Sequence, residues 1–195
     1  MSQLLSDSRR QSDAADRVLL ALVSTGDRRA LDQLYIRYFA RLAKFFQNMT
    51  LRADVVEELI NDTMLEVWKA GEPLLPDASV LLAIMQLAYS RVQQYFAEVR
   101  ADEPRSQRDV HDWERSRPTL AEAIRCNLLT FLSKLPIEER AVVHLVYASG
   151  CSRQEIADVM GIACEHVDVL LGVARATLSY NVTFAPTRAL PTLGR

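Results

Sequence analysis

Apolar residues recur at helical spacing along almost the whole of this 195-residue sequence, and this periodicity constrains the fold more than any other feature. Only 6 glycines and 7 prolines are present, and most of them fall between the periodic segments. We therefore expect an all-α fold. The pattern predicts helices at about residues 13–24, 28–48, 52–70, 78–100, 119–134, 136–148, 152–160 and 164–179.

A break in composition divides these helices into two groups. Residues 101–118 are mostly charged or polar and contain two prolines, which is typical of a flexible linker. We therefore expect two helical domains, at residues 13–100 and 119–180. Residues 1–12 are predicted to form a polar, frayed leader, and residues 181–195, which contain Pro186 and Pro191, a loose tail.

The first helices show how the spacing predicts caps and core positions. Asp27 follows Gly26 and is well placed to cap the second helix. In the first helix the predicted buried residues are Val18, Leu19, Leu22 and Val23.

A helix-turn-helix is predicted between Gly150 and Leu178. Ser152 can cap a short helix that Gly161 ends, because glycine readily takes the positive φ of a helix terminus. The second helix of such a motif enters the major groove of DNA. Here its apolar face is formed by Val167, Leu170, Leu171, Ala174 and Leu178.

The charge of the chain gives little general attraction to nucleic acid. The net charge is -2 and the isoelectric point is near 5.9, whereas DNA-binding domains usually carry a basic patch. The predicted recognition helix begins with Glu165 and His166 and continues to Asp168 and Val169, where phosphates favour Lys or Arg. DNA binding is therefore expected to be local or assisted by a partner.

Composition also indicates the compartment. No apolar run is long enough to span a membrane, and the polar start is no signal peptide. The sequence has three cysteines, Cys126, Cys151 and Cys164, and an odd number cannot all be paired in disulfides. We therefore expect the protein in the reducing cytoplasm.

Catalytic motifs are not evident. The sequence has no Gly-rich phosphate loop, no H-E-x-x-H and no nucleophile elbow. Cys164 and His166 are two residues apart and point to different sides of a helix, so a zinc or redox site that adds Cys151 is a weaker interpretation than small buried thiols. We expect no enzyme activity, no cofactor and no metal.

Three motifs occur in order along the chain. They are G-D-R-R-A-L-D-Q-L-Y-I-R-Y at residues 26–38, A-D-V-V-E-E-L-I-N-D-T-M-L-E-V-W at residues 53–68, and L-P-I-E-E-R-A-V at residues 135–142. With the helix-turn-helix that follows, this order resembles the extracytoplasmic-function group of bacterial RNA polymerase sigma factors. The resemblance covers most of residues 15–180 and implies a sigma region 2-like first domain and a region 4-like second domain.

The resemblance implies that the helix at residues 52–70 docks on the clamp coiled coil of RNA polymerase. Its acidic face suits a basic partner helix, although a solvated acidic face with Trp68 closing the core is an alternative. The candidate polymerase-binding residues are Asp54, Glu57, Glu58, Asn61, Asp62, Leu65 and Trp68.

The resemblance also implies that the helix at residues 78–100 reads the promoter −10 element and that the helix-turn-helix contacts DNA. Aromatic side chains near residues 89–96 either stack on an unpaired base or cap the core. The basic positions typical of the recognition helix are replaced by Asp168, Leu170 and Val173. The candidate DNA-binding residues are Tyr89, Arg91, Tyr95, Arg100, Arg153, Gln154, His166 and Arg175.

These features lead to two main hypotheses. The first is a cytoplasmic sigma factor that binds core RNA polymerase, directs initiation at promoter DNA and is held by an anti-sigma factor. The second is a sigma-like adaptor or decoy that binds polymerase or an anti-sigma factor with little promoter recognition. A regulator that uses only the helix-turn-helix and does not bind polymerase is a third, weaker interpretation.

Overall fold

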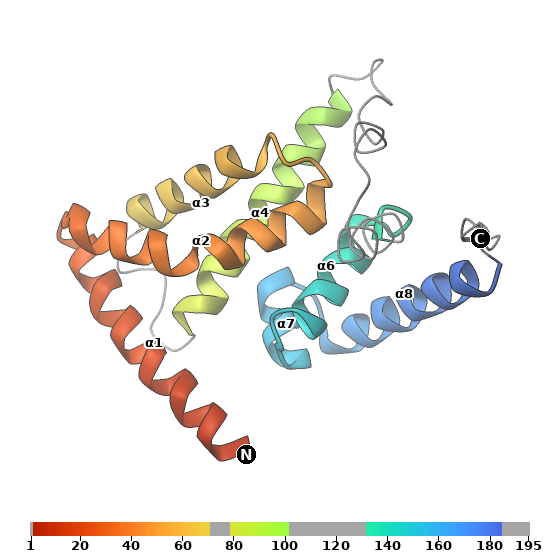
Figure 1. Ribbon diagram of the computed structural model, residues 1–195, viewed down its shortest axis with the longest axis horizontal. Coiled ribbons are helices and arrows are strands. Elements are labelled where there is room, and N and C mark those ends of the chain that lie inside the picture. Colours follow the sequence, from red (N-terminus) through yellow and green to blue (C-terminus); the bar gives the residue numbers. More distant parts are fainter. Residues whose placement is uncertain (1, 71–78, 102–131, 185–195) are drawn as a thin grey trace, which may run out of the picture.

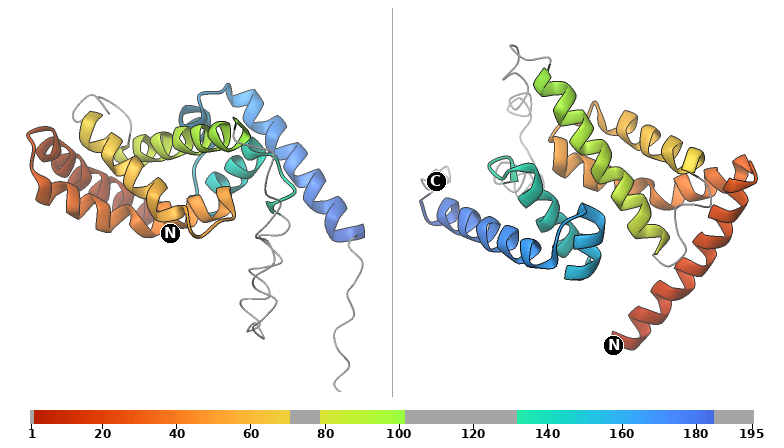
Figure 2. Two further views of the ribbon diagram at one scale, coloured as in Figure 1. Left: turned by 90° about the horizontal axis from the view of Figure 1, so that it is seen from above. Right: turned by 180° about the vertical axis from the view of Figure 1, so that it is seen from behind.

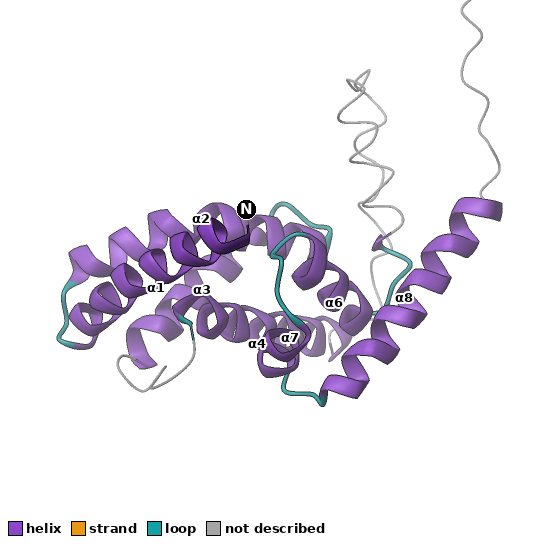
Figure 3. Ribbon diagram, turned by 90° about the horizontal axis from the view of Figure 1, so that it is seen from below, coloured by secondary structure: helices purple, strands orange, loops and turns teal. Residues whose placement is uncertain are grey.

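The structure is a computed structural model that describes residues 2–70, 79–101 and 132–184, and this part of the chain consists of helices joined by loops, without strands (Figure 1, Figure 3). The predicted all-α fold is confirmed. The helices are α1 (Ser2–Ser24), α2 (Arg28–Thr50), α3 (Val56–Ala70), α4 (Val80–Ala101), α6 (Ile137–Tyr147), α7 (Arg153–Met160) and α8 (Cys164–Phe184). Most of the predicted linker and of the predicted helix at residues 119–134 lies outside the described residues.

Both ends of the described chain are more helical than predicted. The expected leader is the start of α1, which begins at Ser2, because residues 2–12 contain neither glycine nor proline to break it. At the other end, α8 continues through the first residues of the expected tail to Phe184.

The predicted caps are confirmed. Asp27 Oδ1 accepts hydrogen bonds from the backbone N–H groups of Arg29 (2.8 Å) and Ala30 (3.4 Å) at the start of α2. Leu51 ends this helix with a left-handed φ of 60°. The next helix, α3, starts only at Val56, four residues later than predicted, because a turn at residues 53–55 intervenes.

The buried stripe of α1 differs from the prediction at Val18, Leu20 and Leu22. Leu19, Leu20 and Val23 are buried, together with Asp16 one turn earlier, and these positions follow one face of the helix. Val18 and Leu22 were expected to be buried, but their side chains are 61% and 42% exposed. Each lies one residue, about 100° of rotation, from the buried stripe.

Carboxylates of α1 fix this helix to the rest of the first domain. Asp16 accepts a hydrogen bond from the Tyr38 hydroxyl at 2.6 Å and forms an ion pair with Arg37 on α2. Asp13 Oδ1 accepts from the hydroxyl of Ser79 (2.7 Å) and from the backbone N–H of Val80 (2.8 Å), which caps the start of α4.

The helices form two groups, with α1 to α4 in the first and α6 to α8 in the second (Figure 1). In the first, α2 packs on α1 and α3, and α3 packs on α4. In the second, α6 and α7 pack on the first part of α8, whose C-terminal half extends away from the other helices (Figure 2).

The two groups are in contact. Helix α2 touches α6 and helix α4 touches α7, and one buried apolar cluster runs through both groups. Buried residues of the first group in this cluster include Phe45 and Met49, and those of the second include Leu145 and Ile156. The predicted domains are therefore packed against each other rather than held apart.

Candidate functional site

Helix α3 separates into a buried face and an exposed polar face. Its buried residues are Val56, Leu59, Ile60, Thr63, Met64 and Val67. The predicted polymerase-binding residues lie away from this stripe, with Asp54, Glu57, Glu58 and Asn61 exposed, Asp62 and Trp68 half-buried and Leu65 50% exposed. The helix therefore presents acidic groups beside apolar surface, as the periodicity predicted.

Three of these polar side chains, those of Asp54, Asn61 and Asp62, have partners within the chain. Arg52 Nε donates to Asp54 at 3.1 Å, and this hydrogen bond lowers the pKa of the Asp54 carboxyl. The Tyr35 hydroxyl donates to Asn61 Oδ1 at 3.0 Å. Within the described part of the chain, Glu57 and Glu58 form no ion pair, so their charges are open to a basic partner.

A predicted polymerase-binding residue and a predicted DNA-binding residue meet between α3 and α4. Arg91 lies 2.8 Å from Asp62, and its guanidinium also donates to Gln94 at 3.1 Å. Both ion-paired residues line a shallow cavity of about 360 Å³, with Leu65, Leu87 and Ser90 on its walls. Arg91 therefore holds α4 to α3 in this structure rather than extending into solvent.

The DNA-binding candidates of α4 are less accessible than predicted. Tyr89 is only 3% exposed, so its proposed stacking on a base is contradicted in this state, and the alternative of a core aromatic holds. Tyr95 is half-buried, and its ring makes an edge contact with that of Phe96 at 5.3 Å between centroids. The side chain of Arg100 lies outside the described part of the structure.

The helix-turn-helix forms as predicted. Ser152 caps α7 through a capping box, in which Glu155 Oε2 accepts from the Ser152 N–H at 2.6 Å. Gly161 ends the helix with a φ of 68°. The buried residues of the helix-turn-helix include Ile156, Val159, Val167, Leu171 and Ala174. Leu170 and Leu178 are half-buried.

Three of the four helix-turn-helix residues that were predicted to contact DNA have polar partners within the second domain. Arg153 pairs with Asp168 at 3.1 Å, and both side chains are exposed. Gln154 donates to Asp158 at 2.9 Å and accepts from the Cys164 thiol at 3.2 Å. Arg175 donates to the Tyr147 hydroxyl at 3.2 Å, and the side chain of His166 is exposed.

The exposed side of α8 also carries apolar residues. Val169 and Val173 are 59% and 45% exposed and lie one turn apart on the helix. The recognition helix therefore offers aliphatic surface where phosphate contact would need cations.

Polar residues at the border of the two domains escaped the sequence analysis. Arg140 is 7% exposed and donates to the backbone carbonyl of Met49 in the last turn of α2 and to that of Leu135 at 2.9 Å. Burial lowers its pKa, while the negative end of the α2 dipole stabilises its charge. The place of Arg140 in the motif L-P-I-E-E-R-A-V was the only signal in the sequence.

His144 lies at the same border. Its Nδ1 is 2.9 Å from the amide nitrogen of Asn48 on α2, and its ring packs edge-on against Phe45 at 5.2 Å. Because the amide nitrogen can only donate, Nδ1 accepts and the imidazole is neutral. Burial first, and the Lys44 charge second, lower the pKa of His144 to about 4.

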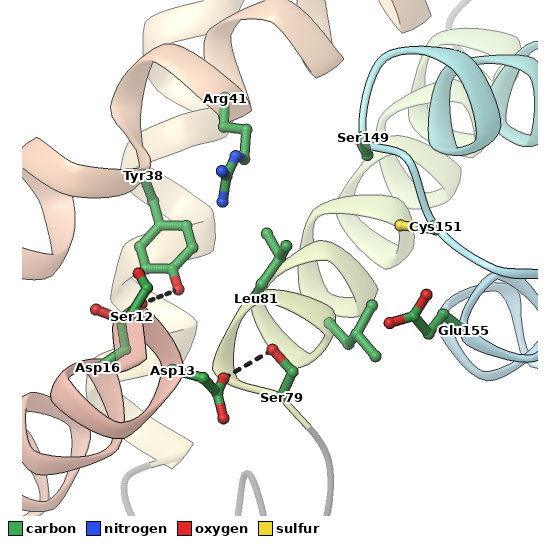
Figure 4. A pocket seen from close by; sticks show the side chains of 11 residues that line it. Ser12, Asp13, Asp16, Tyr38, Arg41, Ser79, Leu81, Ser149, Cys151 and Glu155 are labelled. Atoms are coloured by element: carbon green, nitrogen blue, oxygen red, sulfur yellow. Dashed lines mark hydrogen bonds between the residues drawn. The ribbon is translucent and has the colours of Figure 1, made fainter. Parts of the chain in front are cut away.

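A cavity of about 380 Å³ opens between α1, the start of α4 and the second domain. Figure 4 shows Ser149, Cys151 and Glu155 of the second domain on one side and Asp13, Ser79 and Leu81 on the other. The domains therefore pack closely at the end of α2 and leave space beside α1.

Metal and membrane features are not found in the described residues. They contain no group of three or more His, Cys, Asp and Glu side chains positioned to hold a metal ion. Neither Cys151 nor Cys164 is in a disulfide. Within the described ranges, no helix combines the length and apolar character that crossing a membrane requires.

The structure thus combines an acidic helix on a four-helix domain with a helix-turn-helix domain that follows it. Residues 127–178 match the family of sigma-70 region 4, the domain that contains the helix-turn-helix. This match agrees with the region 4-like second domain that the sequence predicted.

Relatives align with most of the chain. CnrH, an RNA polymerase sigma factor of Cupriavidus metallidurans, is 28% identical over 186 residues, which cover 85% of this chain and 93% of CnrH. SigM, an extracytoplasmic-function (ECF) RNA polymerase sigma factor of Mycobacterium tuberculosis, is 25% identical over 167 residues, 86% of this chain and 84% of SigM. These similarities confirm the resemblance to extracytoplasmic-function sigma factors.

Solved structures show the same fold. CnrH in complex with the cytosolic domain of CnrY has a TM-score of 0.67 at 24% identity and covers 87% of this chain and 97% of its own. The sigma factor RpoE of Bartonella quintana, in complex with the anti-sigma factor NepR, has a TM-score of 0.60 at 18% identity, covering 78% and 96%.

Proposed function

We propose that this protein is a sigma factor of the extracytoplasmic-function type, which binds core RNA polymerase and directs initiation at a restricted set of promoters. The observation that carries the proposal is the exposed acidic face of α3, in a chain similar along most of its length to such factors. The protein would act in the cytoplasm, where RNA polymerase works, and would catalyse no reaction itself.

The proposed docking surface consists of the exposed side of α3. Glu57, Glu58 and Asn61 would meet a basic helix of the polymerase, with Leu65 and Trp68 adding apolar contact beside them. Charge complementarity of this kind sets the orientation and the association rate of a complex. The remaining docking residues, Asp54 and Asp62, would contribute after exchanging their partners Arg52 and Arg91.

DNA contact is proposed for the helix-turn-helix residues Arg153, Gln154, His166 and Arg175, and for Arg91, Tyr95 and Arg100 of α4. Polymerase would supply much of the phosphate affinity, because few basic residues of α8 remain. We also propose an anti-sigma partner, by analogy with the solved relative that is bound to the anti-sigma factor NepR.

Run-off transcription tests the proposal. Core polymerase is combined with this protein on genomic fragments of its source organism, and transcripts are compared with those of core enzyme alone. Discrete new start sites support a sigma factor. Absence of both polymerase binding and new transcripts would contradict it.

The second candidate is an adaptor or decoy that occupies polymerase or an anti-sigma factor and recognises promoters poorly. The pairing of Arg153 with Asp168 favours it, because this ion pair engages a DNA-binding candidate within the helix-turn-helix. Stable binding to core polymerase without any new start site would identify this alternative.

A further inference from the structure

We propose that the cavity between α3 and α4 is a binding site for a backbone phosphate of single-stranded DNA, and that carboxylates of α3 block it until the basic helix of polymerase takes them up. The cavity and its ion pairs are features of this chain alone. The choice of DNA as the ligand rests on the proposed function, because α4 is the helix proposed to meet unpaired promoter bases.

Side chains that can donate hydrogen bonds line this cavity of about 360 Å³. Lys69 comes from α3, and Ser90, Arg91 and Gln94 come from α4. Ser90 and Gln94 are exposed, so a ligand can reach the cavity from solvent. Cationic, hydroxyl and amide donors of this kind are the groups that proteins use to bind DNA phosphates.

Two carboxylates of α3 occupy the cations of the cavity. Asp62 Oδ2 lies 2.8 Å from Arg91 Nη2, and Glu66 Oε1 lies 2.9 Å from Lys69 Nζ. Both carboxylates line the same cavity, and they share one side of α3 because they are one helical turn apart. A phosphate would compete with them for the same two cations, so the site is blocked in this structure.

The guanidinium of Arg91 retains an unused donor. Its Nη1 donates to Gln94 at 3.1 Å, and Glu98 Oε1 is farther away at 3.5 Å. Its Nε is buried and has no hydrogen-bond partner among the described residues. Arginine binds phosphate most strongly through two parallel N–H groups, and Nε can supply one of them. The pairing with Asp62 therefore leaves Arg91 incompletely satisfied.

Both ion pairs can exchange partners. Their side chains are partly exposed, and ion pairs of this kind contribute little free energy because water screens them. Asp62 also lies one turn after Glu58, on the face proposed to dock on polymerase. A basic helix bound to that face can take over the Asp62 carboxylate, and docking would then release Arg91 for DNA.

Binding of the full-length protein to a fluorescein-labelled oligothymidylate tests the site. Asp62→Asn removes the charge of the carboxylate and keeps the size of the side chain, so that Arg91 becomes available. We expect the affinity to rise and the slope of log K against log salt to steepen by about 0.7, the value for one additional phosphate contact on a single strand. Fluorescence anisotropy at a series of salt concentrations measures both.

Three further variants separate release of Arg91 from a general loss of negative charge. Asp32→Asn is the matched control, because Asp32 is exposed on α2 and forms no ion pair among the described residues. It should leave the slope unchanged. Asp62→Asn should also have no effect on the slope when it is added to Arg91→Gln, and Asp62→Glu, which keeps the carboxylate, should retain the slope of the unmodified protein.

The proposal is overturned if Asp62→Asn gives no gain in binding, if Asp32→Asn gives an equal gain, or if the steeper slope persists without Arg91. Inorganic phosphate is the second probe. If it raises the Tm of Asp62→Asn while the affinity for oligothymidylate stays unchanged, the cavity is a site for a small anion and the assignment to DNA is wrong. None of these measurements uses polymerase, so failure of this site and failure of the run-off transcription test remain distinguishable.

Discussion

His144 shows how one buried side chain links folding to pH. Its pKa falls from 6.5 to about 4 in the folded protein, so the unfolded chain binds more protons between these values. The stability from the neutral ring is complete above pH 6.5 and is lost as the pH falls toward 4. This lowering of the pKa of His144 corresponds to roughly 3 kcal/mol.

We therefore expect the free energy of unfolding to decrease between about pH 6.5 and pH 4, and His144→Gln to flatten that slope. Urea denaturation at a series of pH values measures it. His166→Gln is the control, because His166 is exposed and should leave the slope as in the unmodified protein. An unchanged slope in His144→Gln would refute the conclusion that the lowered pKa of His144 causes this pH dependence.

A second prediction concerns the acidic face of α3. Glu58→Lys combined with Asn61→Ala should weaken binding to core polymerase at least roughly tenfold, because it places a cation against a basic partner surface. Biolayer interferometry with immobilised core enzyme measures the dissociation constant.

The matched control for this surface is Asp32→Lys with Gln33→Ala, which makes the same change of charge and removes one side-chain amide on exposed positions of α2. It should bind polymerase as the unmodified protein does. Equal weakening by both double variants would indicate a general charge effect instead of docking through α3.

Single side chains also mark the limit of sequence-based prediction. The 3.6-residue period places Glu58 and Ile60 on opposite faces of α3 because that helix borders the core on one side. It gives no comparable answer for Tyr89, which is 3% exposed and whose pKa is raised by burial and then by the charge of Glu138 on α6. When another helix determines whether a side chain is exposed, the periodicity of its own helix cannot predict the exposure, and the tertiary structure is needed.

At the scale of elements, the helices and their caps could be predicted because their causes are local. The capping box of Ser152 and Glu155 and the left-handed Gly161 lie within the segments they bound. The start of α1 and the end of α8 differ from the prediction, because residues 2–12 and 181–184 contain no glycine or proline and polar composition alone does not end a helix.

The helix-turn-helix yields a prediction of its own. Asp168→Lys should free Arg153 and restore a basic position on α8, so that affinity for duplex DNA rises. The slope of log K against log salt should steepen by about 1 to 2 units, measured by fluorescence anisotropy on a labelled random-sequence duplex. Asp32→Lys makes the same charge change outside the motif, and an equal effect there would contradict a local role of Asp168.

For the whole molecule, the sequence predicted two helical domains but not their contact. Arg140 stood out only as a motif residue, and its acceptor lies 91 residues earlier, on the Met49 carbonyl. No periodicity within either domain encodes such a pairing, because it depends on how two finished surfaces fit. The contacts between the two domains can therefore be identified only from the tertiary structure.

The shared buried cluster predicts how the molecule unfolds. Since one apolar core runs through both domains, calorimetry of the unmodified protein should show a single transition, with the calorimetric enthalpy close to the van't Hoff value. Arg140→Met removes the guanidinium that bonds Met49 and Leu135, so the second domain should melt earlier and the transition should split. Arg175→Met, at an exposed arginine of the same domain, should keep a single transition, and two transitions in the unmodified protein would show that the domains unfold independently.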